Sequence, residues 1–140
     1  MISLVKPYIA PREEMMPAIE KILYSGYIAQ GEAVEKFEKE FGEYIENSNV
    51  LSVNSGTAAL HIALLLLNVG PGDEVISTPM TAEPTNTTIS FTGAKVIWAD
   101  VDPNTGLMDP DSVRQKITEK TKAIMPVHYA GMVCNMDELN

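Results

Sequence analysis

The stretch Asn54-Ser55-Gly56-Thr57-Ala58 is the part of this sequence best suited to binding a charged ligand. It joins a short β-branched run to a strongly apolar segment, which predicts a turn that opens a helix. The first N–H groups of a helix have no intrahelical acceptor, and the helix dipole adds partial positive charge there. A phosphate group would meet these amides and the hydroxyls of Ser55 and Thr57, and Gly56 has no Cβ to obstruct it. The stretch therefore predicts an anion site at Ser55, Gly56, Thr57 and Ala58, and a capped helix end that binds nothing is the alternative.

The other residues capable of chemistry give weaker signals. The turn matches neither GxGxxG nor GxxxxGK[ST], so no motif indicates a dinucleotide or a nucleoside triphosphate. His61 falls in the apolar helix and is expected to be a packed side chain, whereas His128 follows a strand and could face a ligand. Neither histidine has a Cys or carboxylate partner at ligand spacing, so we expect no metal site. Cys134 has no base nearby in the sequence and is expected to be a small buried residue.

The elements that would position these residues alternate along the chain between short β-branched runs and helical patterns. Apolar spacing predicts helices over residues 12–24, 32–46, 57–68, 84–91 and 110–117, and strands over 49–53, 74–78, 95–99 and 122–127. Successive β-α-β steps imply parallel pairing, with helices on both faces of a sheet. The fold class is therefore α/β, and the turn before Gly56 is expected at the carboxyl end of a strand, where ligands of such sheets usually bind.

Composition excludes several kinds of protein. The 140 residues carry 19 acidic and 10 basic side chains, a formal net charge of −9, which disfavours nucleic acid as a partner. The longest apolar run, residues 58–67, is too short to cross a bilayer, so no membrane partner is expected. The N-terminus lacks the pattern of a signal peptide, and a single cysteine cannot form an internal disulfide. These features favour a cytoplasmic protein.

The pattern of elements also suggests how the chain is organised. Residues 1–48 are predicted to form an N-terminal helical segment and residues 49–140 an incomplete α/β domain. The last residues, 136–140, resemble the first turn of another helix that is cut short. We therefore interpret the sequence as a truncated piece of a longer protein, with an unstructured C-terminal tail as the alternative.

An ordered set of motifs resembles one known family. The set consists of Ser55-Gly56-Thr57-Ala58-Ala59-Leu60-His61, Val69-Gly70-Pro71-Gly72-Asp73-Glu74-Val75-Ile76, Thr78-Pro79, Thr92-Gly93-Ala94-Lys95-Val96, Asp100-Val101-Asp102 and Pro126-Val127-His128. Together with Ser25-Gly26-Tyr27-Ile28-Ala29-Gln30-Gly31, it resembles the DegT/DnrJ/EryC1/StrS family of pyridoxal-phosphate-dependent sugar aminotransferases. The resemblance implies the N-terminal part of the large domain of the type I aminotransferase fold, with a mostly parallel sheet.

The resemblance also implies roles for particular residues. Gly56, Thr57 and Ala58, with Ser55 beside them, would hold the phosphate of pyridoxal 5'-phosphate. The loop over residues 79–86, which contains Ala82 and Thr85, would run past the pyridine ring. Family members often carry a stacking aromatic at the position of Ala82, so stacking there should be weaker or absent. The resemblance assigns Tyr27, Gln30 and His128 to the substrate pocket, although a plain linker between two helices explains Tyr27 and Gln30 equally well.

The catalytic groups of the family have no counterpart in these residues. Pyridoxal phosphate chemistry requires a Schiff-base lysine and a carboxylate on the pyridine nitrogen, and none of the lysines present matches that context. We therefore expect no catalytic residue here, and a fragment that cannot turn over alone. The intact enzyme would be a homodimer that aminates a keto-sugar nucleotide with a donor such as glutamate. The alternatives are a sugar-nucleotide dehydratase of the same fold and a non-catalytic phosphate- or nucleotide-binding module.

Overall fold

The computed structural model describes residues 7–140, which divide after Ser52 into two compact units. The sequence placed this boundary between residues 48 and 49. The first unit contains two helices, α1 (Arg12–Ser25) and α2 (Glu32–Tyr44), at the positions that apolar spacing predicted. Two glutamates occupy the first turn of α1, where they face the positive end of the helix dipole, and Gly26 ends the helix with a φ of 81°. On α2, Phe37 and Phe41 stack with their ring centroids 5.7 Å apart.

The strand predicted over residues 49–53 is wrong, because the structure has no strand there. The backbone amide and the hydroxyl of Ser52 instead both donate to Glu38 Oε1, at 2.7 and 2.9 Å. These hydrogen bonds, the backbone amide first, hold the pKa of the Glu38 carboxyl below its ordinary value. A β-branched run becomes a strand only where a neighbouring strand accepts its hydrogen bonds, and here a glutamate side chain takes that place.

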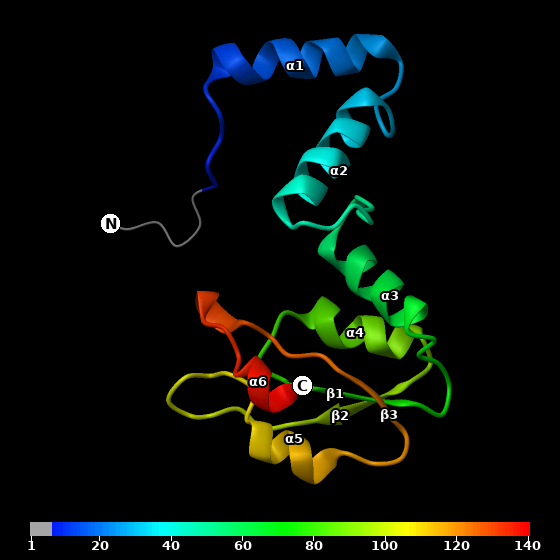
Figure 1. The fold of residues 1–140 in the computed structure, drawn as a ribbon, viewed down its shortest axis with the longest axis vertical. Coiled ribbons are helices and arrows are strands. Elements are labelled where there is room, and N and C mark those ends of the chain that lie inside the picture. The colour runs from blue at the N-terminus through cyan, green and yellow to red at the C-terminus, as the bar shows by residue number, and fades with distance from the viewer. Residues whose placement is uncertain (1–6) are drawn as a thin grey trace. The chain divides into compact units, whose positions relative to one another are not determined.

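The second unit is a three-stranded parallel sheet with helices before, between and after its strands (Figure 1). The strands lie in the order β2-β1-β3, and β1 pairs with both neighbours. Along the chain the elements are α3 (Gly56–Leu66), β1 (Glu74–Ser77), α4 (Glu83–Phe91), β2 (Lys95–Trp98), α5 (Pro110–Lys116), β3 (Thr121–Ile124), a 3-10 turn η1 (Tyr129–Gly131) and α6 (Met136–Leu139). The remaining predicted elements therefore form, and α6 occupies the position of the expected C-terminal helical turn.

Successive residues of β1 point to opposite faces of the sheet and bury two separate cores. Val75 packs with Leu64 of α3 and Ile89 of α4. Ile76 packs on the other face with Val113 of α5 and, farther along the chain, Cys134. Both β1 side chains are fully buried, as the two-residue period of a strand requires when both faces are covered. The α/β class with helices on both faces is confirmed.

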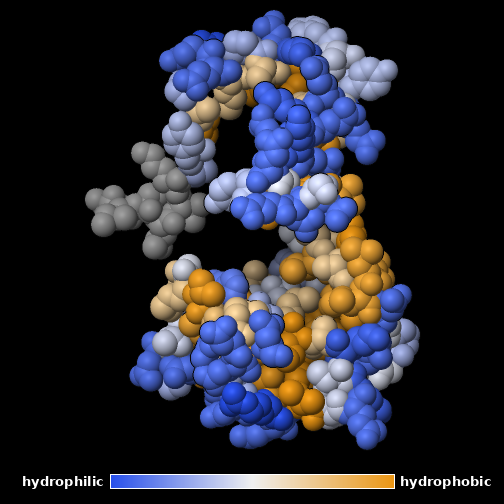
Figure 2. All heavy atoms as spheres, viewed as in Figure 1, coloured by the Kyte–Doolittle hydropathy of each residue, from blue (hydrophilic) through white to orange (hydrophobic). Residues whose placement is uncertain are grey.

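Apolar side chains remain exposed on α3. Leu65, Leu66 and Leu67 at its C-terminal end are 51, 77 and 53 % exposed. Figure 2 shows hydrophobic side chains gathering over this helix on the viewed face of the unit. Within residues 7–140 no helix combines the length and apolarity that a membrane crossing requires.

Candidate functional site

The N-terminus of α3 is capped by a side chain of its own turn. Ser55 is extended, with φ −162° and ψ 156°, and its Oγ accepts the amide hydrogen of Ala58 at 3.2 Å. The Ser55 carbonyl accepts from Ala59 at 3.1 Å, which begins the helical ladder. Among the described residues no group accepts from the amides of Gly56 or Thr57. The prediction of a free amide at Ala58 is therefore wrong, because a serine at the N-cap takes that donor.

The residues around the two remaining amides are exposed or partly exposed. Ser55 and Gly56 are exposed, and a Cβ placed on Gly56 would meet no atom within 4 Å. Ser55 Oγ accepts from Ala58, and its hydroxyl donates to Asn54 Oδ1 at 3.4 Å, a long bond that a phosphate oxygen would replace. A phosphate has acceptor oxygens for the two amides and for the hydroxyls of Ser55 and Thr57. Its negative charge is also favoured by the positive end of the helix dipole. The residues present therefore fit the phosphate of a pyridoxal cofactor.

The loop after β1 is organised by threonine hydroxyls. Buried Thr78 accepts the Met80 amide at Oγ1, at 3.2 Å, and its carbonyl accepts from Asn86 Nδ2 at 3.1 Å. The hydroxyls of Thr81 and Thr85 lie 2.8 Å apart, so Thr85 already has a partner within the loop. Ala82 is the N-cap of α4, with an exposed side chain, and its carbonyl accepts the Thr85 amide at 3.1 Å. The structure thus brings Ala82 and Thr85 together at the carboxyl end of β1.

Three loops meet at Gly106, which the sequence did not single out. A Cβ on Gly106 would lie 3.1 Å from Met80 Cε and 3.4 Å from Tyr129 Cδ1, and its φ of 72° is in the left-handed region. Met80 follows β1, Gly106 follows β2 and Tyr129 follows β3, so the contact joins the carboxyl ends of all three strands. The turn before it is fixed by Asp102, whose Oδ1 accepts the Asn104 and Thr105 amides at 2.7 and 3.0 Å and whose pKa these bonds lower.

The two histidines differ in their surroundings. His128 is exposed in the loop that follows β3, and its Nδ1 accepts the backbone amide hydrogen of Cys134 at 3.1 Å. The thiol of Cys134 donates to the Val127 carbonyl at 3.2 Å, and the residue is 3 % exposed, so the prediction of a buried cysteine is confirmed. His61 is half-buried and packs edge-on against Phe91 with ring centroids 5.7 Å apart, as a packed helix residue should.

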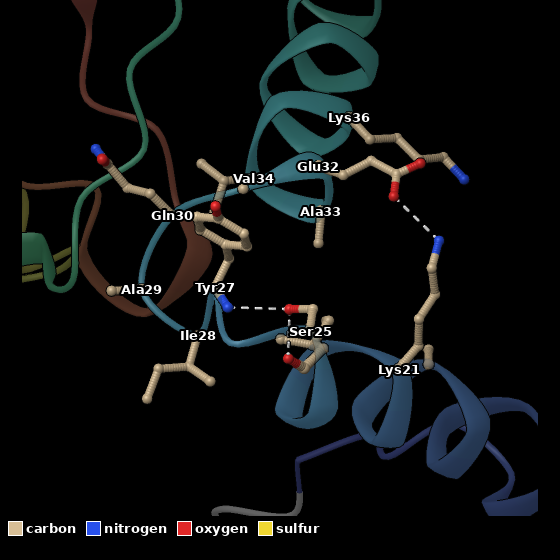
Figure 3. A pocket seen from close by; sticks show the side chains of 13 residues that line it. Lys21, Ser25, Tyr27, Ile28, Ala29, Gln30, Glu32, Ala33, Val34 and Lys36 are labelled. Carbon is tan, nitrogen blue, oxygen red and sulfur yellow. Dashed lines mark hydrogen bonds and ion pairs between the residues drawn. The ribbon is translucent and has the colours of Figure 1, made fainter.

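Tyr27 and Gln30 belong to the first unit and line one hollow of about 480 Å³ between α1 and the start of α2 (Figure 3). The Tyr27 amide donates to Ser25 Oγ at 3.0 Å, which turns the chain back after α1. The ion pair of Lys21 Nζ with Glu32 Oε2, at 3.0 Å, also lies at this hollow and joins the two helices. The linker between the helices therefore forms one wall of a pocket in addition to connecting α1 and α2.

The lysines of the described residues all lie at the surface. All of them are exposed, and Lys21 and Lys36 pair with Glu32 and Glu40 on the surface. A reactive lysine would need a desolvated or electropositive setting that these positions lack. In the same residues, 7–140, no three His, Cys, Asp or Glu side chains come together as metal ligands.

Comparison with known proteins identifies the family of this chain. Residues 10–140 match the DegT/DnrJ/EryC1/StrS aminotransferase family, and the chain belongs to this family. It is 42 % identical, over 95 % of its length, to the spore coat polysaccharide biosynthesis protein SpsC of Bacillus subtilis, of which it covers 35 %.

Solved structures give the same result. The chain is similar to the PLP-form structure of a putative sugar aminotransferase, Spr1654 of Streptococcus pneumoniae, with a TM-score of 0.90 and 38 % sequence identity. The match covers 99 % of this chain and 35 % of that chain. It is equally similar to the sugar aminotransferase CalS13 of Micromonospora echinospora, with a TM-score of 0.90, 39 % identity and coverage of 99 % and 37 %. The family and these structures indicate pyridoxal phosphate as the cofactor. The chain spans about a third of the length of these relatives.

Proposed function

We propose that this chain is the N-terminal portion of a pyridoxal-phosphate-dependent enzyme that aminates a keto-sugar nucleotide. The observation that carries the proposal is that the amides of Gly56 and Thr57 have no acceptor within residues 7–140, at a helix N-terminus in a chain of this family. When bound, the cofactor supplies the electron sink for amine transfer. Gly56 and Thr57, with the Ser55 and Thr57 hydroxyls, would hold its phosphate.

Other residues would line the rest of the site. The loop with Ala82 would run along the cofactor ring, and its Thr85, whose hydroxyl lies 2.8 Å from that of Thr81, would also bind the cofactor. Tyr27 and Gln30, which line the hollow of the first unit, and the exposed His128 would contact the sugar nucleotide. A homodimer, a glutamate amino donor and a cytoplasmic location complete the proposal.

Two alternatives share part of this support. A sugar-nucleotide dehydratase of the same fold would use the same phosphate site, since the difference lies in a lysine that these residues do not contain. A non-catalytic phosphate-binding module would need only the α3 N-terminus. The exposed lysines support the expectation that residues 1–140 alone do not turn over.

The test is to read the gene downstream of residue 140, express its whole product and incubate it with a keto-sugar nucleotide, glutamate and pyridoxal phosphate. Mass spectrometry of an amino sugar nucleotide, formed in step with 2-oxoglutarate, would support the aminotransferase. Loss of water from the sugar without gain of nitrogen would establish the dehydratase instead. If the reading frame ends at residue 140, the enzymatic proposal fails for this gene product and the binding module remains.

A further inference from the structure

The segment from Val127 to Cys134 is closed on itself by two hydrogen bonds that converge on one residue. The Cys134 amide donates to His128 Nδ1 at 3.1 Å, and the Cys134 thiol donates to the Val127 carbonyl at 3.2 Å. Cys134 also packs into the apolar cluster around Ile76. We propose that His128 is a pH-sensitive latch, whose neutral imidazole holds this loop closed and whose protonation releases it. The proposal concerns a loop at the carboxyl edge of the sheet and does not depend on the proposed enzymatic function.

The bond to Cys134 defines the protonation state of the ring. A backbone N–H can donate only to a nitrogen that carries a lone pair, so Nδ1 is unprotonated and the proton of the neutral ring is on Nε2. In the imidazolium form both nitrogens carry hydrogens, and Nδ1–H would point at the Cys134 N–H. The acceptor is then lost, and two donors face each other.

The loop that the latch closes has an unfavourable backbone conformation. Ala130 has φ 52° and ψ 29°, in the left-handed region that non-glycine residues seldom occupy, and Gly131 follows with φ 83°. Such a conformation persists only where surrounding contacts impose it. Since the two bonds at Cys134 close the loop around Ala130, loss of one of them allows the backbone to relax and Cys134 to leave its buried position.

The charged groups of the elements around Cys134 mostly have partners of their own. On the β2–α5 connection, Asp102 accepts the amides of Asn104 and Thr105, and Asp100 lies 3.5 Å from Ser112 Oγ. On α5 and α6, Arg114 pairs with Asp111 and Glu138, while Asp109 caps α5 and Asp137 lies in the first turn of α6. Among the described residues no carboxylate forms an ion pair with either histidine.

The experiment uses Cys134, the single cysteine of the chain, as the reporter. The 140-residue protein is labelled with 4,4'-dithiodipyridine between pH 5 and 8. At each pH the labelling rate of Cys134 is divided by the labelling rate of a cysteine peptide, which removes the intrinsic pH dependence of the thiol. We expect the ratio to rise about five-fold toward acid pH, the change that one hydrogen bond of ordinary strength corresponds to. A ratio that stays flat would overturn the proposal.

Two variants of His128 form a matched pair. Asn places an acceptor oxygen where Nδ1 lies but does not titrate, so His128→Asn should label slowly at every pH. Gln carries its acceptor one bond farther out, so His128→Gln should label fast at every pH. If His128→Asn shows the same acid-dependent rise as the wild type, the loop opens for another reason and the latch is excluded.

A measurement on the unmutated ring keeps the proposal testable even where a variant fails to fold. Nitrogen-15 NMR spectra at pH 8 should show the His128 ring with its proton on Nε2 and none on Nδ1. The His128 signals are the imidazole signals that remain in the His61→Gln variant. The Cys134 amide resonance should shift with the same midpoint as the His128 ring. A proton on Nδ1 at pH 8 would contradict the latch directly.

Discussion

Ser55 Oγ lies 3.2 Å from the amide nitrogen of Ala58 and accepts its hydrogen, and this one bond determines how α3 begins. The cap satisfies one of the donors that a helix start leaves open. It leaves the amides of Gly56 and Thr57 without an acceptor among the described residues. Ser55 therefore starts the helix and at the same time determines which donors a bound anion would meet.

Replacing the cap should separate its effect on the helix from its effect on binding. Ser55→Ala should lower the free energy of unfolding by about 1 kcal/mol, since an uncapped Ala58 amide loses its acceptor. Ser55→Asp keeps an acceptor at the same place and should retain most of that stability. Urea unfolding of both variants measures the difference. An unchanged midpoint for Ser55→Ala would show that this cap does not contribute to stability.

A carboxylate at Gly56 should affect stability and anion binding in opposite directions. Gly56→Asp should raise the unfolding free energy by about 0.5 kcal/mol, because it removes a glycine from the helix and adds a negative charge to its first turn. The same charge should weaken binding of pyridoxal phosphate by about tenfold, by repulsion of the phosphate. Thermal unfolding and calorimetric titration measure the two effects.

Gly56→Asn is the matched control, with nearly the same shape and no charge. It should bind pyridoxal phosphate more tightly than Gly56→Asp. Equal affinities for the two variants would mean that the ligand does not approach the α3 N-terminus, and would remove the main support for the proposed phosphate site.

The residues that the sequence predicted correctly follow periodic patterns, and the missed features depend on single side chains. The strand predicted over residues 74–78 forms, and its Val75 and Ile76 are buried on opposite faces that helices cover, as the predicted β-α-β order requires. Residues 49–53 show the same β-branched composition, but Ser52 donates to Glu38 instead of to a strand. No sequence pattern could have shown that a glutamate would take its amide.

The candidate site was predictable to a similar extent. A serine before a helix is an ordinary N-cap signal, so the loss of the Ala58 amide could have been inferred from Ser55 itself. The contact of His128 with Cys134 was not accessible in this way. It depends on an alanine, Ala130, that takes a left-handed conformation, and alanine gives no indication of such a turn.

Truncation of Ile76 should be among the most damaging core changes. Its side chain is fully buried on the face covered by α5 and α6, so Ile76→Ala should cost about 2–5 kcal/mol of unfolding free energy. Leu66→Ala removes a comparable side chain that is 77 % exposed, and it should change stability by less than about 0.5 kcal/mol. Chemical denaturation of both variants checks the contrast, and similar losses would contradict the two-faced core.

An aromatic residue at position 82 should strengthen cofactor binding without affecting the fold. Ala82 is exposed at the N-cap of α4 with no side-chain hydrogen bond, so a ring can be added there without displacing a buried neighbour. Stacking of aromatic rings is worth about 0.5–1.5 kcal/mol, so Ala82→Phe should bind pyridoxal phosphate roughly two- to tenfold more tightly. Ala82→Leu adds similar bulk without an aromatic face and is the control. Equal affinity of the Phe and Leu variants would exclude stacking at this position.

Asp102 should make the second unit sensitive to acid. The amide hydrogens of Asn104 and then Thr105 stabilise its carboxylate and lower its pKa in the folded protein. A carboxyl with a depressed folded pKa stabilises the fold above its unfolded pKa of about 3.9, and this contribution is lost as the pH falls through the folded value. Asp102→Asn should therefore melt at a lower temperature than the wild type at pH 7, and the difference should shrink progressively as the pH falls below about 4. Glu119→Gln, at an exposed residue with no hydrogen bond among those described, should leave the melting temperature nearly unchanged across the same range. If the difference in melting temperature between Asp102→Asn and the wild type persists unchanged to pH 3, the destabilisation does not come from removal of the Asp102 charge.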